Sequence, residues 1–112
     1  MVLAKTELFE VGLQEKANLF KALAHPARLQ ILEYLVMTRT CLTGDLSEIF
    51  PLTRTTINQH MKELKDVGLI ISHEKGSKIY YCLDCEKIKE MSSVFSALLK
   101  LFQLPHDFCC KD

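Results

Sequence analysis

The chain has no net charge and no long apolar run. Its 14 Lys and Arg residues are balanced by 14 Asp and Glu residues, so the whole molecule has no field that attracts nucleic acid or acidic lipid. No stretch approaches the ~20 consecutive apolar residues that a membrane-spanning helix needs. Residues 1–10 also lack the basic start and apolar block of a signal peptide. We therefore expect a cytosolic protein with no membrane contact.

Sequence features of enzymes are also missing. There is no glycine-rich phosphate loop, no His and Cys pair at a recognisable spacing, and no carboxylate pair in an apolar context. The composition, 48% apolar and 25% charged with four Gly and three Pro, is typical of a compact globule. At this length we expect one domain over residues 1–112, with no enzymatic activity. The alternative from another class is a small thiol enzyme or a metal-buffering protein, and tight metal uptake without binding to nucleic acid would favour buffering.

Apolar periodicity predicts helices at both ends of the chain. Apolar residues recur every three or four positions between Lys5 and Leu23, and again over about 85–104, where Pro105 ends the pattern. A further helix is expected to start at Pro26, since proline is favoured at the first helical position. A core of this size cannot cover both terminal helices. We therefore expect their apolar faces to meet a second copy, which makes the protein a homodimer with 85–104 as a dimerisation helix.

The middle of the chain has the spacing of a helix-turn-helix, over about residues 43–67. A short helical turn is predicted from Asp45 to Phe50, where Pro51 stops it. A second helix then begins at the N-cap Thr53 and ends before Gly68. Only a few residues connect the two helices, as in a helix-turn-helix.

A β-hairpin is predicted directly after this helix, over about residues 69–83. Two runs rich in β-branched and aromatic residues, Leu69–Ser72 and Ile79–Leu83, flank a polar tip at 74–78. A helix-turn-helix followed by a hairpin with a basic tip is a winged helix. The predicted fold class is therefore mainly α with a β-hairpin wing (α+β).

Near the N-terminal half of the helix after Thr53, the outward side chains are hydrogen-bonding and none is acidic. Asn and Gln can pair with adenine and Arg with guanine in a major groove, while lysines at the hairpin tip can touch phosphates. A solvated helix face is the plainer alternative. The candidate DNA-binding residues are Thr53, Arg54, Thr55, Thr56, Asn58, Gln59 and Lys62 on the helix, with Lys75, Ser77 and Lys78 on the wing.

Several runs together resemble the ArsR/SmtB family of small winged-helix repressors. The matching segments occur in the family's order: Lys21 to Leu32, Asp45-Leu46-Ser47, Thr55 to Leu64, Val67-Gly68-Leu69-Ile70 and Gly76 to Leu83. The resemblance implies a homodimeric repressor on double-stranded operator DNA. It also implies that an inducer, usually a metal ion or metalloid, releases the protein from that DNA.

The family's usual sensor sites do not map cleanly onto this chain. One such site uses Cys-x-Cys just before an Asp-Leu pair, but here Cys41 is the only thiol near Asp45. Another uses histidines on the last helix, and residues 85–104 contain none. We interpret His25 and His60 as structural residues rather than ligands.

The cysteines are the remaining candidates for a sensor. Their number, five, is odd, so a closed disulfide framework of the secreted type is not expected. Cys109 and Cys110 are adjacent in a tail over 105–112, and soft trivalent arsenic or antimony prefers sulfur ligands. Cys41 or Cys85 would supply a third thiolate. We therefore hypothesise a repressor released by arsenic(III) or antimony(III), with no permanently bound cofactor.

Two alternatives keep the DNA-binding fold and change the signal. The cysteines could act as a redox or reactive-sulfur switch, or bind zinc, cadmium or lead. Cys82 is interpreted as a small buried apolar residue in its strand. Its C-x-x-C spacing with Cys85 lacks a partner pair and is weak support for zinc.

Overall fold

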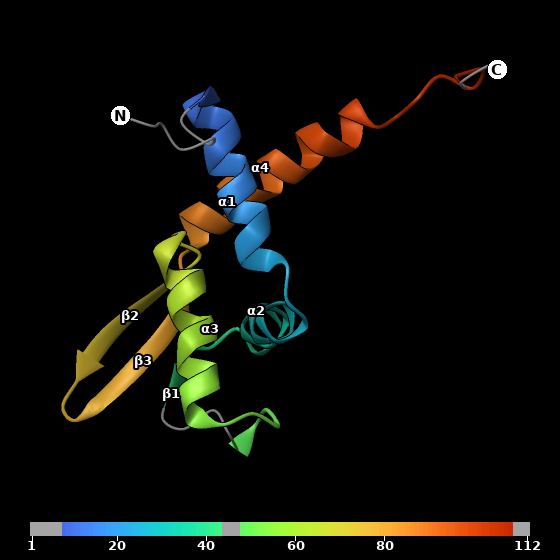
Figure 1. The fold of residues 1–112 in the computed structure, drawn as a ribbon. Coiled ribbons are helices and arrows are strands. Elements are labelled where there is room, and N and C mark those ends of the chain that lie inside the picture. Colours follow the sequence, from blue (N-terminus) through green and yellow to red (C-terminus); the bar gives the residue numbers. More distant parts are fainter. Residues whose placement is uncertain (1–7, 44–47, 109–112) are drawn as a thin grey trace.

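The computed structural model describes residues 8–43 and 48–108, and shows a winged helix-turn-helix of helices and one small sheet (Figure 1). The predicted fold class is thereby confirmed. In chain order the elements are α1 (Val11–Leu23), α2 (Pro26–Thr38), β1 (Leu42–Thr43), α3 (Arg54–Asp66), β2 (Ile70–Lys75), β3 (Lys78–Leu83) and α4 (Cys85–Leu101).

The hydrophobic core lies where α2 and α3 meet the base of the hairpin. Its most completely buried side chains are Ile31 and Leu35 of α2, Ile57 and Leu64 of α3, and Leu69 before β2. The last turns of α1 add two further leucines to the same cluster. This packing fixes α3 on the body of the protein, so its opposite face remains in solvent.

Helix α2 begins as the sequence predicts. Pro26 occupies its first turn, and the His25 ring accepts a hydrogen bond at Nδ1 from the backbone N–H of Ala27 (3.0 Å). Helix α2 continues to Thr38 and ends at Arg39, whose φ of 55° is left-handed.

The sheet has three antiparallel strands in the order β1-β3-β2. Strand β1 was not predicted, since a strand of two residues has no readable period. The hairpin turn is also tighter than expected: Lys75 lies opposite Lys78, which leaves Gly76 and Ser77 as the turn. Gly76 has a φ of 67°, a conformation that favours glycine in two-residue hairpin loops.

The terminal helices α1 and α4 cross on one side of the molecule, and α4 continues outward toward the C-terminus (Figure 1). At the crossing the rings of Phe20 and Phe95 lie 5.5 Å apart. Helix α1 starts at Val11, later than the predicted Lys5; residues 5–7 of that prediction lie outside the described residues. Helix α4 ends at Leu101, before the predicted position 104, and none of its residues is fully buried.

The first helix of the predicted helix-turn-helix falls largely on residues 44–47, outside the described part of the chain. At its predicted end, residues 48–50 are not α-helical. Phe50 is buried in the core there, and its ring meets that of Tyr34 edge-on at 5.8 Å. The chain then passes through Pro51 and Leu52 into α3.

Candidate nucleic-acid interface

Both ends of α3 have the caps that the sequence predicts. The hydroxyl oxygen of Thr53 accepts a hydrogen bond from the backbone N–H of Thr56 (3.3 Å), and the Thr53 hydroxyl donates to Thr56 Oγ1 (2.9 Å). At the other end Gly68 adopts a φ of 83°, and its N–H donates to the carbonyl of Lys65 (2.9 Å). The helix therefore has fixed ends, so its exposed face has a defined length.

The two faces of α3 differ sharply. Ile57, Met61 and Leu64 are buried against the core, whereas Thr56 is half-buried beside its cap. The candidate DNA-binding side chains that remain exposed on this helix are Arg54, Thr55, Asn58, Gln59 and Lys62. We call these five residues the polar face of α3. Thr53, at the cap, is exposed as well.

A weak ion pair lies at the far end of this face. Lys62 Nζ lies 3.7 Å from a carboxylate oxygen of Asp66, and both side chains are well exposed. An exposed pair of this kind contributes only ~0–1 kcal/mol. Lys62 can therefore exchange Asp66 for a phosphate group at little cost.

The hairpin places its candidate residues at the tip, away from the core. Lys75, Ser77 and Lys78 are all exposed. Behind the tip, His73 stacks on Tyr80 with ring centroids 5.4 Å apart and an interplanar angle of 7°, which stiffens the hairpin near its turn. The wing therefore presents two lysines from opposite strands at one point.

A groove of about 500 Å³ lies between α3 and the wing. Asn58 and Lys62 line it from the polar face, and Lys65, His73 and Tyr81 line it from elsewhere. Lys65 and His73 were not among the sequence-predicted site residues. The three-residue step from Lys62 to Lys65 was the available signal for Lys65, whereas His73 is brought there only by the hairpin.

His60 lies on the buried side of α3 and joins that helix to α2. Arg28 Nε donates to His60 Nδ1 (3.2 Å), while Arg28 Nη1 donates to the carbonyls of Lys21 (3.3 Å) and Ala22 (3.2 Å) at the end of α1. The ring of His25 lies 4.3 Å from that of His60. These contacts agree with a structural role for both histidines.

The pKa of His60 lies below its ordinary value. Burial disfavours the charged ring, and the nearby His25 and Arg28 add to this effect, whereas Glu63 opposes it. A neutral imidazole is also what the Arg28 hydrogen bond requires, because Nδ1 must accept. The folded state therefore favours the neutral form of this ring.

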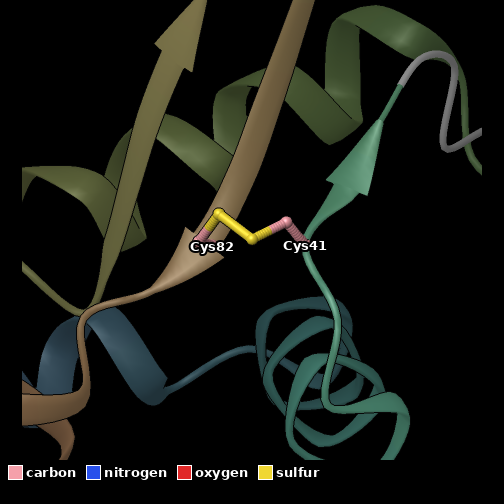
Figure 2. The surroundings of a disulfide bond; sticks show 2 residues. All are labelled: Cys41 and Cys82. Atoms are coloured by element: carbon pink, nitrogen blue, oxygen red, sulfur yellow. A yellow bond between two sulfur atoms is a disulfide. The ribbon is translucent and has the colours of Figure 1, made fainter.

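Two cysteines expected to act separately are joined. Cys41 and Cys82 form a disulfide between the residue preceding β1 and strand β3, with Cα atoms 4.5 Å apart (Figure 2). This corrects the interpretation of Cys82 as a small buried apolar residue. It also means that Cys41 has no free thiolate for a tail site in this state. The pair was not predicted because β1, which creates it, has no signal in the sequence.

The other thiols do not gather into a site in the described structure. Cys85 is a free, exposed cysteine at the start of α4, and Cys109 and Cys110 lie outside the described residues. Over 8–43 and 48–108, no group of three or more His, Cys, Asp or Glu side chains could hold a metal ion. In the same ranges no helix has the length and apolar character to cross a membrane.

Comparison with known proteins places this geometry in a family. Residues 23–73, which contain α2, α3 and the start of the hairpin, match a helix-turn-helix domain family. The chain is 38% identical over 74 residues to an arsenical resistance operon repressor of Bacillus subtilis, an alignment that covers 66% of this chain and 70% of the relative.

Two further similarities extend over more of the chain. The CadC homolog of Staphylococcus aureus, a cadmium resistance transcriptional regulatory protein, is 28% identical over 79% of this chain and 73% of its own length. The structure of HlyU from Vibrio cholerae superposes with a TM-score of 0.63 at 28% identity, covering 80% of this chain and 97% of HlyU.

The fold and the arrangement of α3 with its wing define a DNA-binding transcriptional regulator, not an enzyme. This chain belongs to the ArsR family of transcriptional repressors.

Proposed function

We propose that this repressor binds operator DNA as a homodimer, with the polar face of α3 in the major groove and the wing on the flanking backbone. The single observation that carries the proposal is the composition of that face. Its exposed side chains are hydrogen-bonding or basic, while the apolar side of α3 is buried in the core. Such a helix presents base-reading groups outward on a rigid support. Because operator DNA is its partner, the protein would act in the cytoplasm.

The dimer in this proposal uses the terminal helices. Helix α4 has 17 residues and none fully buried. Large apolar side chains remain exposed at its end and at the start of α1, including Leu99, Leu101, Phe102, Phe9 and Leu13. Exposed apolar surface of this kind is typical of a protein interface. A second copy, which brings the same surface, would cover it.

The inducer in this proposal is a thiophilic ion, arsenic(III) or antimony(III). The arsenical and cadmium resistance regulators among the relatives support an inducer of this chemistry, as do five cysteines in 112 residues. The adjacent Cys109 and Cys110 stay a sequence-based prediction for its ligands.

A second candidate signal is thiol oxidation. The Cys41–Cys82 disulfide is the observation that favours it, since a switch of this kind would alternate between the bonded and the reduced pair. In either case the signal releases DNA only if it stabilises a conformation that does not bind DNA more than it stabilises the DNA-binding conformation.

The base-reading assignment is tested by fluorescence anisotropy on DNA from upstream of the protein's own gene, at fixed salt. Arg54→Ala and Gln59→Ala should each weaken specific binding by about 1–3 kcal/mol, the discrimination from one good side-chain pairing with a base. Binding to unrelated DNA should change less. Glu48→Ala, at an exposed residue outside the polar face, is the control. Unchanged operator affinity in both variants would contradict the assignment.

A further inference from the structure

The register of the sheet, and not the sulfur bond alone, brings Cys41 and Cys82 together. Leu42 pairs with Tyr81 and Thr43 with Tyr80. One step back along the same antiparallel register, Cys41 lies opposite Cys82. Their Cα separation of 4.5 Å is the spacing of a cross-strand pair without mutual hydrogen bonds, where side chains approach closely. We therefore expect the sheet to keep the two sulfurs adjacent when they are reduced.

This pair is open to small molecules and lies between the two DNA-binding parts. Cys41 is exposed and Cys82 half-buried. Strand β1 is the element that precedes α3 in the chain, and β3 carries the chain from the wing tip to α4 (Figure 1). A change in the distance between Cys41 and Cys82 therefore shifts β1, which precedes α3, relative to β3 of the wing.

From this placement we infer that the reduced Cys41 and Cys82 form a two-thiolate binding site for arsenic(III), through which the inducer acts. The inference rests on the proposed function and names its sensor site. Arsenous acid, As(OH)₃, would exchange two hydroxyl groups for the two sulfurs. Two As–S bonds form, two As–O bonds break, and the two thiol protons leave with the hydroxyls as two water molecules. Arsenic keeps one hydroxyl and its oxidation state, so this step needs no oxidant.

The disulfide seen here must first be reduced. A trialkylphosphine does this by breaking the S–S bond to give two thiols, while the phosphine becomes a phosphine oxide with oxygen from water. Bound arsenic then joins the sulfurs through an intervening atom, which holds them further apart than a direct bond and more rigidly than free thiols. The site thus gives β1 and β3 a different spacing when it is occupied.

Binding at this site must be coupled reciprocally to DNA binding. If arsenic lowers operator affinity by a given factor, operator DNA lowers arsenic affinity by the same factor. Couplings of this kind are commonly about 5–150-fold. The relation applies only if arsenic prefers the shape that leaves DNA.

The experiment uses the full chain, reduced with a phosphine and then freed of it, and titrated with arsenite. Intact mass measures arsenic on the protein without DNA, and anisotropy measures operator release. The variants are Cys41→Ser, Cys82→Ser and the double Cys109→Ser, Cys110→Ser. Cys85→Ser is the matched control, because Cys85 is a free, exposed cysteine three residues from Cys82. Thermal unfolding checks each variant, and Cys41→Ala replaces Cys41→Ser if the latter does not fold.

We expect the native chain and Cys85→Ser to gain one arsenic and lose operator affinity by about tenfold or more. Cys41→Ser and Cys82→Ser should bind operator DNA but lose both the stable adduct and the release. Release that persists in these two variants, or that is lost only in the tail variant, would overturn the site and leave the proposed function standing. Release of the operator DNA on oxidation, with no arsenic adduct on the protein, would overturn the arsenic site in favour of a redox signal. Failure of every reduced protein to bind operator DNA would refute the proposed function, while the mass measurement still tests the site.

Discussion

At the scale of single residues, Arg28 and His60 connect three helices. Arg28 bonds to two carbonyls at the end of α1 and to His60 on α3. His60 is only 8% exposed. A proton added at Nδ1 of His60 would break the bond from Arg28, because that nitrogen could no longer accept a hydrogen bond. It would also place a second positive charge beside the guanidinium. The link between α1 and α3 through Arg28 is therefore sensitive to acid.

The low pKa of His60 predicts that stability falls in acid. The ordinary histidine pKa is 6.5, and the folded value is lower, so between the two the unfolded chain binds more protons than the folded one. The contribution of neutral His60 to the stability of the fold is complete above pH 6.5 and decreases as the pH falls through the pKa of the folded state. Urea unfolding of the reduced chain between pH 8 and pH 5 measures how its free energy of unfolding depends on pH. The decrease should begin below about pH 6.5, the ordinary histidine pKa.

His60→Gln is the comparison for that prediction. Glutamine does not titrate, and its side-chain oxygen can accept from Arg28. Stability of this variant should depend less on pH over the same range. His106→Gln, at an exposed histidine near the C-terminus, should keep the native dependence. An equal loss of pH dependence in both variants would exclude His60 as the source.

Single residues also differ in how well the sequence predicted them. Thr53 was predicted as an N-cap because a hydroxyl three residues before a backbone N–H is a local signal. The structural role of His60 agrees with its place on the buried side of α3. Cys82 was misinterpreted, because its partner lies 41 residues away and no local pattern gives that contact.

At the scale of elements, the wing should contribute to affinity without reading sequence. Its lysines, Lys75 and Lys78, face each other across the hairpin next to the turn. Replacing both by Ala should weaken binding to operator and unrelated DNA alike. For each phosphate that the wing no longer neutralises, the slope of log affinity against log salt should become shallower by about 0.9. Anisotropy at several salt concentrations measures the slope.

The control for the wing is Lys89→Ala with Lys100→Ala. Both lysines are exposed and lie on α4, outside the proposed interface with DNA. This double variant has the same change in net charge as the wing variant. An equal reduction of the salt slope in the two would show that overall charge, rather than the wing, determines the effect.

Most elements were predictable because their signals are local. Apolar periodicity, Pro26, Thr53 and Gly68 located α2 and α3 within a residue or two. Strand β1 was not predictable, since two residues have no period and exist as a strand only because β3 pairs with them. The groove beside α3 likewise depends on how the hairpin folds back, so His73 could not be assigned to it from sequence.

At the scale of the whole molecule, the exposed apolar end of α4 should determine oligomeric state. Leu101 and Phe102 are 69% and 66% exposed, and in the proposed dimer a second copy buries them. Leu101→Glu with Phe102→Glu should give a monomer in sedimentation equilibrium. Operator affinity should fall strongly, because one subunit reaches only one half-site.

Val36→Glu is the control for the dimer. Val36 is a large apolar residue of α2 that is 52% exposed and lies outside the terminal helices. This variant should remain dimeric and keep its operator affinity. A native chain that sediments as a monomer, or a double α4 variant that remains a dimer, would refute the proposed interface.

The cross-link between Cys41 and Cys82 also changes the topology of the chain. In the disulfide form it closes a covalent ring that contains α3 and almost all of the hairpin, while α1, α2 and α4 are linear arms outside it. Closing a loop across a sequence separation of 41 residues lowers the conformational entropy of the unfolded chain. In the chain-entropy description this raises the free energy of the unfolded state by about 4 kcal/mol. A molecule pulled from its two ends can therefore extend only through the arms. The segment that holds α3 and the wing, which we propose to read DNA, stays shielded from the pulling force until a reductant opens the ring.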